Sequence, residues 1–233
     1  DPIGNRSISL IKNWGGDYAA TSPKEIFNDP KIRNVFVASN HASHAEYAIE
    51  ALLKDKIVHI EKPHVISHEQ LNKLIKTYYK LENPKIYLGF NRPKSYLFKT
   101  LQKHIRNETG PISINWFIAS HAIDPDHWYF RDSEGGRILG NLCHWTDLSL
   151  RMVGLENAFP ITIKTLNPQK SDSNFSISIL FGDTSLASIS FSCKGHTFEG
   201  VREYLNLHKG DLLASLRDFK DLRIDKGEKR IFK

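Results

Sequence analysis

The sequence predicts an α/β protein in two parts: an incomplete parallel sheet in residues 1–90 and an α+β domain with a large, mostly antiparallel sheet in residues 91–233. Two short Val- and Ile-rich runs, at 35–38 and 57–60, flank a segment with apolar residues at helical spacing, which indicates a strand, a helix and a second strand. In later segments Ile, Leu or Phe alternates with Ser or Thr, which favours antiparallel strands with one exposed face.

The first 90 residues carry the signals of a regular alternation of helices and parallel strands. Helices are expected at 7–14, 23–27, 43–56 and 67–81, and strands at 35–38, 57–60 and 85–90. Several helix starts have a Ser followed three residues later by Glu or Gln, the spacing of a capping box. These pairs are Ser22 with Glu25, Ser43 with Glu46, and Ser67 with Gln70.

From Asn91 the pattern changes to two helices and a run of strands. Helices are expected at 93–106 and 137–153, and strands at 112–120, 161–166, 175–181, 185–193, 198–207, 211–216 and 219–224, before a turn at 225–228. Helices placed on one face of such a meander give an α+β domain. Its Ser-rich outer face is open to two interpretations, a solvated surface or a contact with another subunit.

Composition excludes several classes of protein. The 233 residues are 40% hydrophobic, and no apolar run approaches the ~20 residues of a membrane helix. No signal peptide opens the chain, so a cytoplasmic protein without membrane partners is expected. The distant Cys143 and Cys193 indicate neither a disulfide nor a zinc site. The net charge of +6 is spread among acidic residues, so nucleic acid is not expected as a partner, whereas anionic, phosphate-bearing ligands would be attracted.

Polar residues follow the first two predicted strands. Ser39, Asn40 and His41 come after the first strand, and Glu61, Lys62 and Pro63 after the second. Ligands of parallel α/β sheets bind at the carboxyl ends of the strands, so these residues predict a site. The alternative is ordinary turn chemistry, and Lys62 could equally be a solvated strand-end lysine.

Two blocks of sequence resemble a known family. The first is Glu61-Lys62-Pro63, about twenty residues after Asn40-His41. The second runs from His127-Trp128 to Asp132 and from Gly135-Gly136 through His144 to Asp147. Together they resemble the Gfo/Idh/MocA oxidoreductases, in the sub-pattern of members from surface-polysaccharide clusters and two-part dehydrogenase fusions. The resemblance covers nearly the whole chain and implies a Rossmann-type dinucleotide-binding domain over 1–90 and a substrate-binding and oligomerisation domain over 91–233.

The resemblance also implies an activity: hydride transfer between the nicotinamide of NAD or NADP and a hydroxyl-bearing carbon of a sugar or nucleotide-sugar. Lys62 and His144 would be catalytic, the Lys62–Pro63 bond is often cis in the family, and the chain would form a homo-oligomer through its open sheet. The cofactor-binding residues would be Asp1, Ser39, Asn40, His41, Glu61, Lys62 and Pro63. The substrate-binding residues would be Arg92, His127, Trp128 and Asn141. No metal is expected, although His121, Asp124, Asp126 and His127 are ligand types.

Several of these residues have simpler interpretations. His144, beside Cys143 and Trp145, could be a satisfied core histidine, and Asp1 could be a frayed terminal residue. Arg92 could form a salt bridge at the domain junction instead of holding a carboxylate or phosphate of the substrate. The loop at His127 and Trp128 suits a sugar, because an indole packs on its apolar face, but an exposed Trp loop also suits a protein interface.

The sequence departs from the family pattern at three places. Gly140 stands where many members have Asp, and Asn141 stands where the related sub-pattern has Glu; Asn cannot accept a proton as a base. No G-x-G-x-x-G phosphate-binding turn is present, so the chain is expected to be a fragment of a longer polypeptide. The competing hypotheses are a non-catalytic scaffold or ligand-binding relative, and one module of a fused dehydrogenase.

Overall fold

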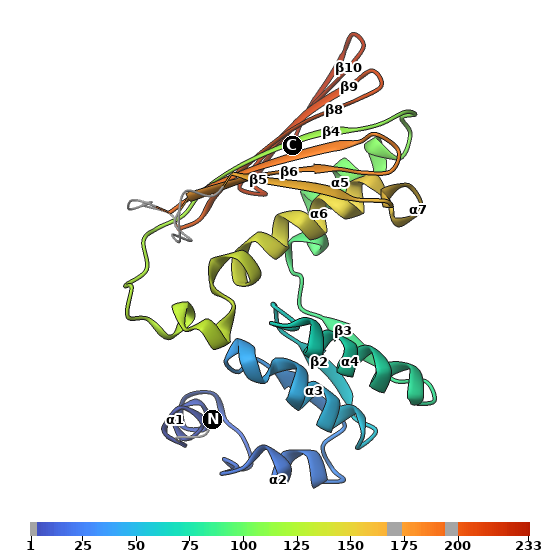
Figure 1. The fold of residues 1–233 in the computed structure, drawn as a ribbon. Helices are drawn as coiled ribbons and strands as arrows, with labels where there is room; N and C mark the ends of the chain where they lie inside the picture. Colours follow the sequence, from blue (N-terminus) through green and yellow to red (C-terminus); the bar gives the residue numbers. More distant parts are fainter. Residues whose placement is uncertain (1–3, 167–173, 194–199) are drawn as a thin grey trace. The chain divides into compact units, whose positions relative to one another are not determined.

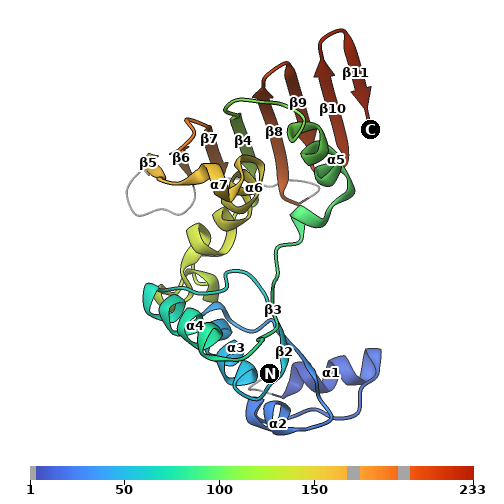
Figure 2. The same cartoon turned by 90° about the vertical axis from the view of Figure 1, so that its right-hand side faces the viewer.

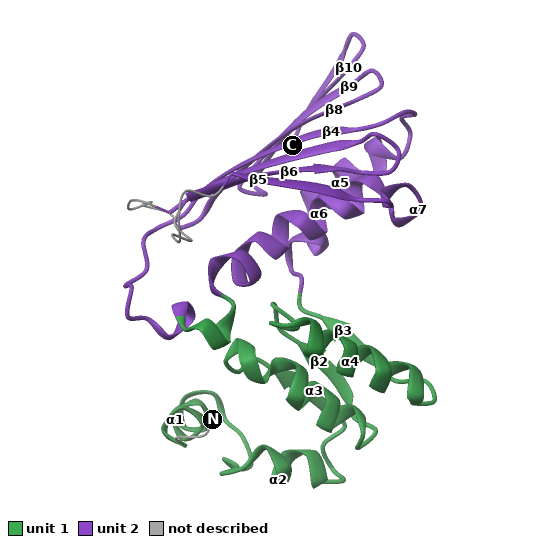
Figure 3. Ribbon diagram, viewed as in Figure 1, with its two compact units in different colours: residues 1–89, 131–135 green, residues 90–130, 136–233 purple. Residues whose placement is uncertain are grey.

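The computed structural model describes residues 4–166, 174–193 and 200–233. These residues form two units, which are described separately below. Unit 1 comprises Asp1–Gly89 together with Arg131–Gly135, and unit 2 comprises Phe90–Phe130 together with Gly136–Lys233 (Figure 3). The segment 131–135 therefore packs with the first half of the chain although it is encoded in the second.

Unit 1 is built on a three-stranded parallel sheet in the order β1-β2-β3 (Figure 1). The strands are β1 (Asn34–Val37), β2 (Ile57–Ile60) and β3 (Ile86–Leu88), and the helices are α1 (Asn5–Trp14), α2 (Pro23–Asn28), α3 (His44–Leu52) and α4 (His68–Lys80). Val58 pairs with both Val35 and Ile86 in register. Alternate strand residues and the apolar side of α3 form one core, with Ala48, Val58 and Ile60 fully buried. The expected βαβ arrangement is confirmed.

The predicted helix starts have different outcomes. Ser22 and Glu25 form the expected capping box at α2, and Ser67 accepts from Gln70 N at α4. The prediction for Ser43 was wrong. Its hydroxyl donates to Asn40 O at 2.8 Å and does not cap α3, because a short 3₁₀ turn, η1 (His41–Ser43), precedes that helix.

Unit 2 is an eight-stranded, mostly antiparallel sheet in the order β11-β10-β9-β8-β4-β7-β6-β5. The strands are β4 (Ser113–Ala119), β5 (Thr162–Leu166), β6 (Asn174–Leu180), β7 (Leu186–Ser192), β8 (Arg202–Lys209), β9 (Leu212–Arg217), β10 (Asp221–Lys226) and β11 (Lys229–Phe232). The pair of β4 with β7 is parallel, whereas β4 and β8 are antiparallel.

The helices of unit 2 lie on one face of this sheet (Figure 2). They are α5 (Tyr96–Ile105), α6 (Cys143–Val153) and α7 (Leu155–Ala158). Trp116 on β4 and Trp145 on α6 are among the largest fully buried side chains between helices and sheet. The outer face instead exposes residues such as Phe117 and Leu213.

Some predicted bounds in unit 2 were wrong. A strand expected from residue 198 begins at Arg202, and residues 194–199 lie outside the described part. The last strand, β11, was not predicted; it pairs with β10 across the turn expected at 225–228. The helix expected over 137–153 is a π-helix at Ile138–Leu142 followed by α6. Within the described ranges, no helix is long and apolar enough to cross a membrane.

Candidate functional site

Apart from Asp1, the predicted cofactor residues lie at one edge of the parallel sheet of unit 1, where β1 and β2 end. We call residues 39–44 and 61–66 the strand-end rim. The backbone ladder continues into it, since Glu61 N donates to Val37 O at 2.9 Å and Gly89 N donates to Ile60 O at 2.8 Å. A Cβ on Gly89 would lie 2.9 Å from both Glu61 Oε1 and Ile60 O, so the close approach of these turns requires glycine.

Lys62 is a half-buried residue of this rim. Its backbone N–H donates to Glu61 Oε2 at 3.2 Å, and the Lys62–Pro63 peptide bond is cis. The positive charge of Lys62 is close enough to His41 to help lower its pKa. The two residues that the sequence placed after neighbouring strands therefore interact electrostatically within unit 1.

His41 is buried and held by the segment that joins unit 1 from the second half of the chain. Its Nδ1 lies 2.8 Å from the backbone oxygen of Glu134, and the Glu134 carboxylate accepts from Ala42 N at 3.0 Å. Burial is the main cause that lowers the pKa of His41, which favours a neutral ring at pH 7. Ser39 and Asn40 are exposed beside it, and Asp1 lies outside the described residues.

In unit 2, His144 is a buried residue in the first turn of α6. Its ring makes edge-on contacts with Phe90 and Trp145, at centroid distances of 6.0 and 6.1 Å. Asn141 lies just before it in the π-helix, and Asn141 Oδ1 accepts a 2.7 Å hydrogen bond from the Tyr129 hydroxyl. π-Helical turns often occur at functional sites, and the π-helix at Ile138–Leu142 therefore fits a functional role for this segment.

Arg92 is bound to a carboxylate of its own unit. Its Nε and Nη2 donate to Glu203 Oε2 and Oε1, both at 2.7 Å, and Trp145 Nε1 donates to the same Oε2 at 2.8 Å. The guanidinium also lies 5.4 Å from the centre of the Trp145 ring. The salt-bridge interpretation of Arg92 thus has direct structural support, and substrate binding by Arg92 stays a prediction.

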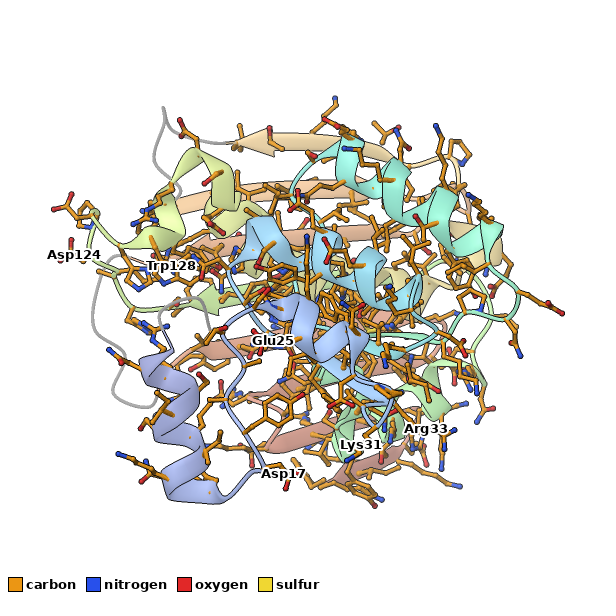
Figure 4. All side chains as sticks on the ribbon, turned by 90° about the horizontal axis from the view of Figure 1, so that it is seen from below. Asp17, Glu25, Lys31, Arg33, Asp124 and Trp128 are labelled. Carbon is orange, nitrogen blue, oxygen red and sulfur yellow. The ribbon has the colours of Figure 1, made fainter. Side chains whose placement is uncertain are left out.

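The loop after β4 carries His127 and Trp128, whose rings are 5.4 Å apart. His127 is exposed and Trp128 is half-buried. Asp124, labelled with Trp128 in Figure 4, belongs to the same loop, and its Oδ1 accepts a 2.9 Å hydrogen bond from Asp126 N. No group of three or more His, Cys, Asp or Glu residues suited to a metal occurs in the described part of the chain.

Sequence reasoning missed several residues that organise these sites. In unit 1 they are His44, Gln70 and Glu134; in unit 2 they are Tyr129 and Glu203. The sequence does place His44 near the predicted site, three residues after His41. Glu203 gives no local signal, because it is 111 residues from Arg92.

The βαβ unit with polar strand ends, followed by a large open sheet, defines a two-part α/β protein. Residues 1–89 match the family model described as an oxidoreductase family with an NAD-binding Rossmann fold, GFO_IDH_MocA. These residues are therefore similar to the NAD-binding domain of the Gfo/Idh/MocA oxidoreductases.

The chain is also similar to individual oxidoreductases. An uncharacterised oxidoreductase of Synechocystis sp. is 24% identical over 229 residues, which cover 88% of this chain and 60% of the relative. Myo-inositol 2-dehydrogenase of Thermotoga maritima is 28% identical over 153 residues, covering 65% of this chain and 45% of the relative. The chain therefore spans less than two thirds of the length of these curated relatives.

A solved structure shows the same fold over the whole chain. Levoglucosan dehydrogenase in complex with NADH and levoglucosan has a TM-score of 0.82 at 18% identity, covering 100% of this chain and 69% of that one. At this level of identity the likeness establishes the fold alone. The expected α/β architecture, with a parallel sheet followed by a mostly antiparallel one, is confirmed.

Proposed function

We propose that the protein transfers a hydride between the nicotinamide of NAD or NADP and a hydroxyl-bearing carbon of a sugar or nucleotide-sugar. The observation that carries the proposal is the strand-end rim, where the Asn40-His41 and Lys62-Pro63 turns lie at one edge of a parallel sheet. Support also comes from the relatives, which include a myo-inositol 2-dehydrogenase and a levoglucosan dehydrogenase with bound NADH. The sequence resembles members from surface-polysaccharide clusters, and the substrate class we propose is a sugar or a nucleotide-sugar.

The rim has side chains suited to the nicotinamide end of a dinucleotide. Ser39 and Asn40 are exposed and can hydrogen-bond an amide or a ribose hydroxyl, and Glu61 adds a carboxylate after the end of β2. His41 favours its neutral form, so Lys62 supplies the positive charge at this place. The bound nicotinamide supplies the hydride acceptor or donor. We assign Ser39, Asn40, His41, Glu61, Lys62 and Pro63 to its binding.

Lys62 and His144 would handle the proton of the reacting hydroxyl. The Lys62 ammonium can hydrogen-bond the hydroxyl oxygen and favour loss of its proton, while an imidazole exchanges protons near neutral pH. Trp128, His127 and Asn141 would position the sugar, through the indole face and through hydrogen bonds to its hydroxyls. Arg92 could bind the substrate only if its ion pair with Glu203 broke. We therefore consider Arg92 a weaker candidate for substrate binding than Trp128, His127 and Asn141.

A non-catalytic relative is the second candidate, and the Tyr129–Asn141 pair favours it. Where the related sub-pattern has a carboxylate, this chain has a neutral amide that accepts a bond from a phenol. Such a pair can bind a sugar but cannot take its proton. In this case the protein would bind a sugar or a dinucleotide without turnover.

The open face of the sheet in unit 2 supports a further proposal, a homo-oligomer. Phe117 and Tyr204 lie on neighbouring strands of this face with ring centres 6.1 Å apart, and Phe117 is 48% exposed. Small polar residues such as Ser190 are exposed on the same sheet. An exposed sheet face with aromatic residues of this kind is suited to contact with a second copy of the chain.

Cofactor binding and turnover test the proposal. The full-length protein is titrated with NADH and NADPH by fluorescence, and nicotinamide absorbance is followed with a panel of sugars and nucleotide-sugars. K62M and H144N are each expected to lower kcat/KM at least about 100-fold, the lower range for general acid–base groups. K54M and H208N, at exposed positions of the same units, are the controls. Absence of both binding and turnover contradicts the proposal, and binding without turnover favours the second candidate.

A further inference from the structure

His44 connects the two turns of the strand-end rim. It is the first residue of α3, with only 1% of its surface exposed. Its Nδ1 lies 2.8 Å from the carbonyl oxygen of Pro63, and its Nε2 lies 2.9 Å from the carbonyl oxygen of Ser39. A neutral imidazole donates one of these bonds and the protonated ring donates both. A single buried side chain therefore joins the turn after β1 to the turn that carries Lys62.

The bond to Pro63 acts on the backbone next to Lys62. Proline has no N–H, so residue 63 cannot hold its own position by donating a backbone hydrogen bond. Its carbonyl is instead held by His44, while Lys62 N on the other side donates to Glu61 Oε2 at 3.2 Å. The peptide segment that bears the Lys62 side chain is thus fixed on both sides by side chains of unit 1.

Gln70 makes a second connection between the same turns, at a different place. Its Nε2 donates to Ala42 O at 2.7 Å, and its Oε1 accepts from Ile66 N at 2.9 Å. Loss of Gln70 would loosen the rim without removing the bond at Pro63. This residue therefore separates a general loosening of the two turns from a local effect on Lys62.

Several ionisable groups surround His44. The His41 ring lies 5.8 Å away on η1, His64 follows Pro63, and the Glu134 carboxylate binds the same 3₁₀ turn from residues 131–135. Lys62 contributes the nearby positive charge. Within this group of charges, a ring nitrogen of His44 lies at hydrogen-bond distance from Pro63 O.

We propose that His44 is a positioning residue for Lys62: it holds the Pro63 carbonyl and so fixes the direction from which the lysine amine enters the site. The consequence for catalysis rests on the proposed function, in which Lys62 contacts the substrate hydroxyl. The positioning itself is a property of unit 1 and is measurable without substrate. His44 touches neither reacting atoms nor cofactor in this proposal, and it acts through Lys62.

The reactivity of the Lys62 amine tests the positioning directly. The full-length wild type and the variants H44Q, Q70A and H68Q are treated with a limiting amine-acylating reagent, and labelling of each lysine is followed by mass spectrometry. In H44Q the labelling rate of Lys62 is expected to rise about fivefold, the factor that corresponds to the loss of one hydrogen bond. Lys54 is the internal control in each sample, and Q70A and H68Q, the latter at an exposed histidine of α4, should leave Lys62 near its wild-type rate. An unchanged Lys62 rate in H44Q, or an equal rise in Q70A, overturns the proposal.

Two further measurements keep the test decisive. If H44Q does not fold, NMR of ring-labelled histidine in the wild type replaces it. A slowly exchanging ring N–H of His44 supports the bridge, and a rapidly exchanging one overturns it. Where the wild type turns over a sugar, H44Q should lower kcat with little change in KM, and should have no added effect in a K62M background. Additive effects contradict action through Lys62, whereas failure of the wild type to bind cofactor or turn over sugar contradicts only the proposed function.

Discussion

The Tyr129 hydroxyl donates a hydrogen bond of 2.7 Å to Oδ1 of Asn141, in the π-helix that precedes His144. Tyr129 is 8% exposed and Asn141 is half-buried, so this bond is partly shielded from water. This bond uses one acceptor position of the amide oxygen, whereas the amide nitrogen is a donor. Asn141 is therefore suited to contact an acceptor atom, such as a hydroxyl or carbonyl oxygen, and not to remove a proton.

The first prediction concerns this pair. Y129F removes the bond that fixes the amide, and we expect kcat/KM for the sugar to fall about fivefold. N141D should keep a bond to Tyr129, since a carboxylate also accepts, and should add a base that gives the pH profile of kcat/KM a new acidic limb. Y96F, at a largely exposed tyrosine of α5, is the control. Equal kcat/KM for Y129F and Y96F would show that Tyr129 does not contribute to the site.

The second prediction concerns the buried carboxylate of Glu134. It is 5% exposed and accepts from Ala42 N, so E134A leaves a buried donor without its partner. We expect unit 1 to lose about 1–3 kcal/mol of stability. Urea unfolding measures the loss of stability. Faster hydrogen exchange at the Ala42 amide would show that the loss arises at the bond between Ala42 N and the Glu134 carboxylate. E69Q, in an exposed i,i+4 pair with Lys73, should change little. An unchanged Ala42 exchange rate in E134A would show that the carboxylate is not needed there.

The third prediction distinguishes the two interpretations of Arg92. R92M leaves the buried Glu203 carboxylate without its cation, so we expect a loss of about 3–5 kcal/mol in the stability of unit 2. The double variant R92M/E203M should recover much of this loss, because no unpaired charge remains. If Arg92 instead serves the substrate, the R92M protein unfolds at the wild-type urea concentration and only KM rises.

The sequence was sufficient for the parts of the fold that depend on local pattern. The runs at Val35 and Ile57 predicted β1 and β2 because apolar strands and an amphipathic helix have different periods. Ser43 does not cap α3, because its hydroxyl donates a hydrogen bond to Asn40 O instead. The spacing of Ser43 and Glu46 in the sequence does not indicate this alternative partner. The sequence likewise predicted a helix at Asn141 but not that it would be a π-helix.

Long-range partners were the part that the sequence did not reveal. Lys62 and the Asn40-His41 turn were identified because polar residues after parallel strands have a known meaning. Glu134 and Glu203 were missed, because each reaches its partner only after the chain has folded, across 92 and 111 residues respectively. Carboxylates are common on protein surfaces, and the sequence around Glu134 and Glu203 does not indicate that these two side chains are buried.

The fourth prediction concerns the open sheet face of unit 2. F117R places a charge beside Tyr204 on the proposed subunit contact, and we expect it to lower the association constant at least about tenfold. Sedimentation of the full-length protein over a range of concentrations measures this change. Y96R carries the same charge onto an exposed residue of α5 and is the control. A wild-type protein that stays monomeric, or an F117R protein with wild-type association, contradicts the oligomer proposal.

The fifth prediction follows from His64, at the end of the Lys62-Pro63 turn. Burial, together with the nearby His44 and His59 rings, lowers the pKa of His64 from 6.5 to about 4. The folded state therefore binds fewer protons than the unfolded state between these pH values, so stability rises with pH in this window. The contribution of His64 is fully present above pH 6.5 and is lost as the pH falls toward about 4.

The expected size of this effect is on the order of 3 kcal/mol, from the linkage between a pKa difference and stability. Hydrogen exchange of β1 and β2 amides measures the stability of unit 1 separately from that of unit 2, which is necessary because two units need not unfold together. H64Q should flatten the dependence on pH between about 4 and 6.5, whereas H208Q, at an exposed histidine of unit 2, should keep the wild-type slope. A wild-type slope in H64Q would mean that the His64 ring is hydrated in the folded protein, because only a ring withdrawn from water resists protonation in this range.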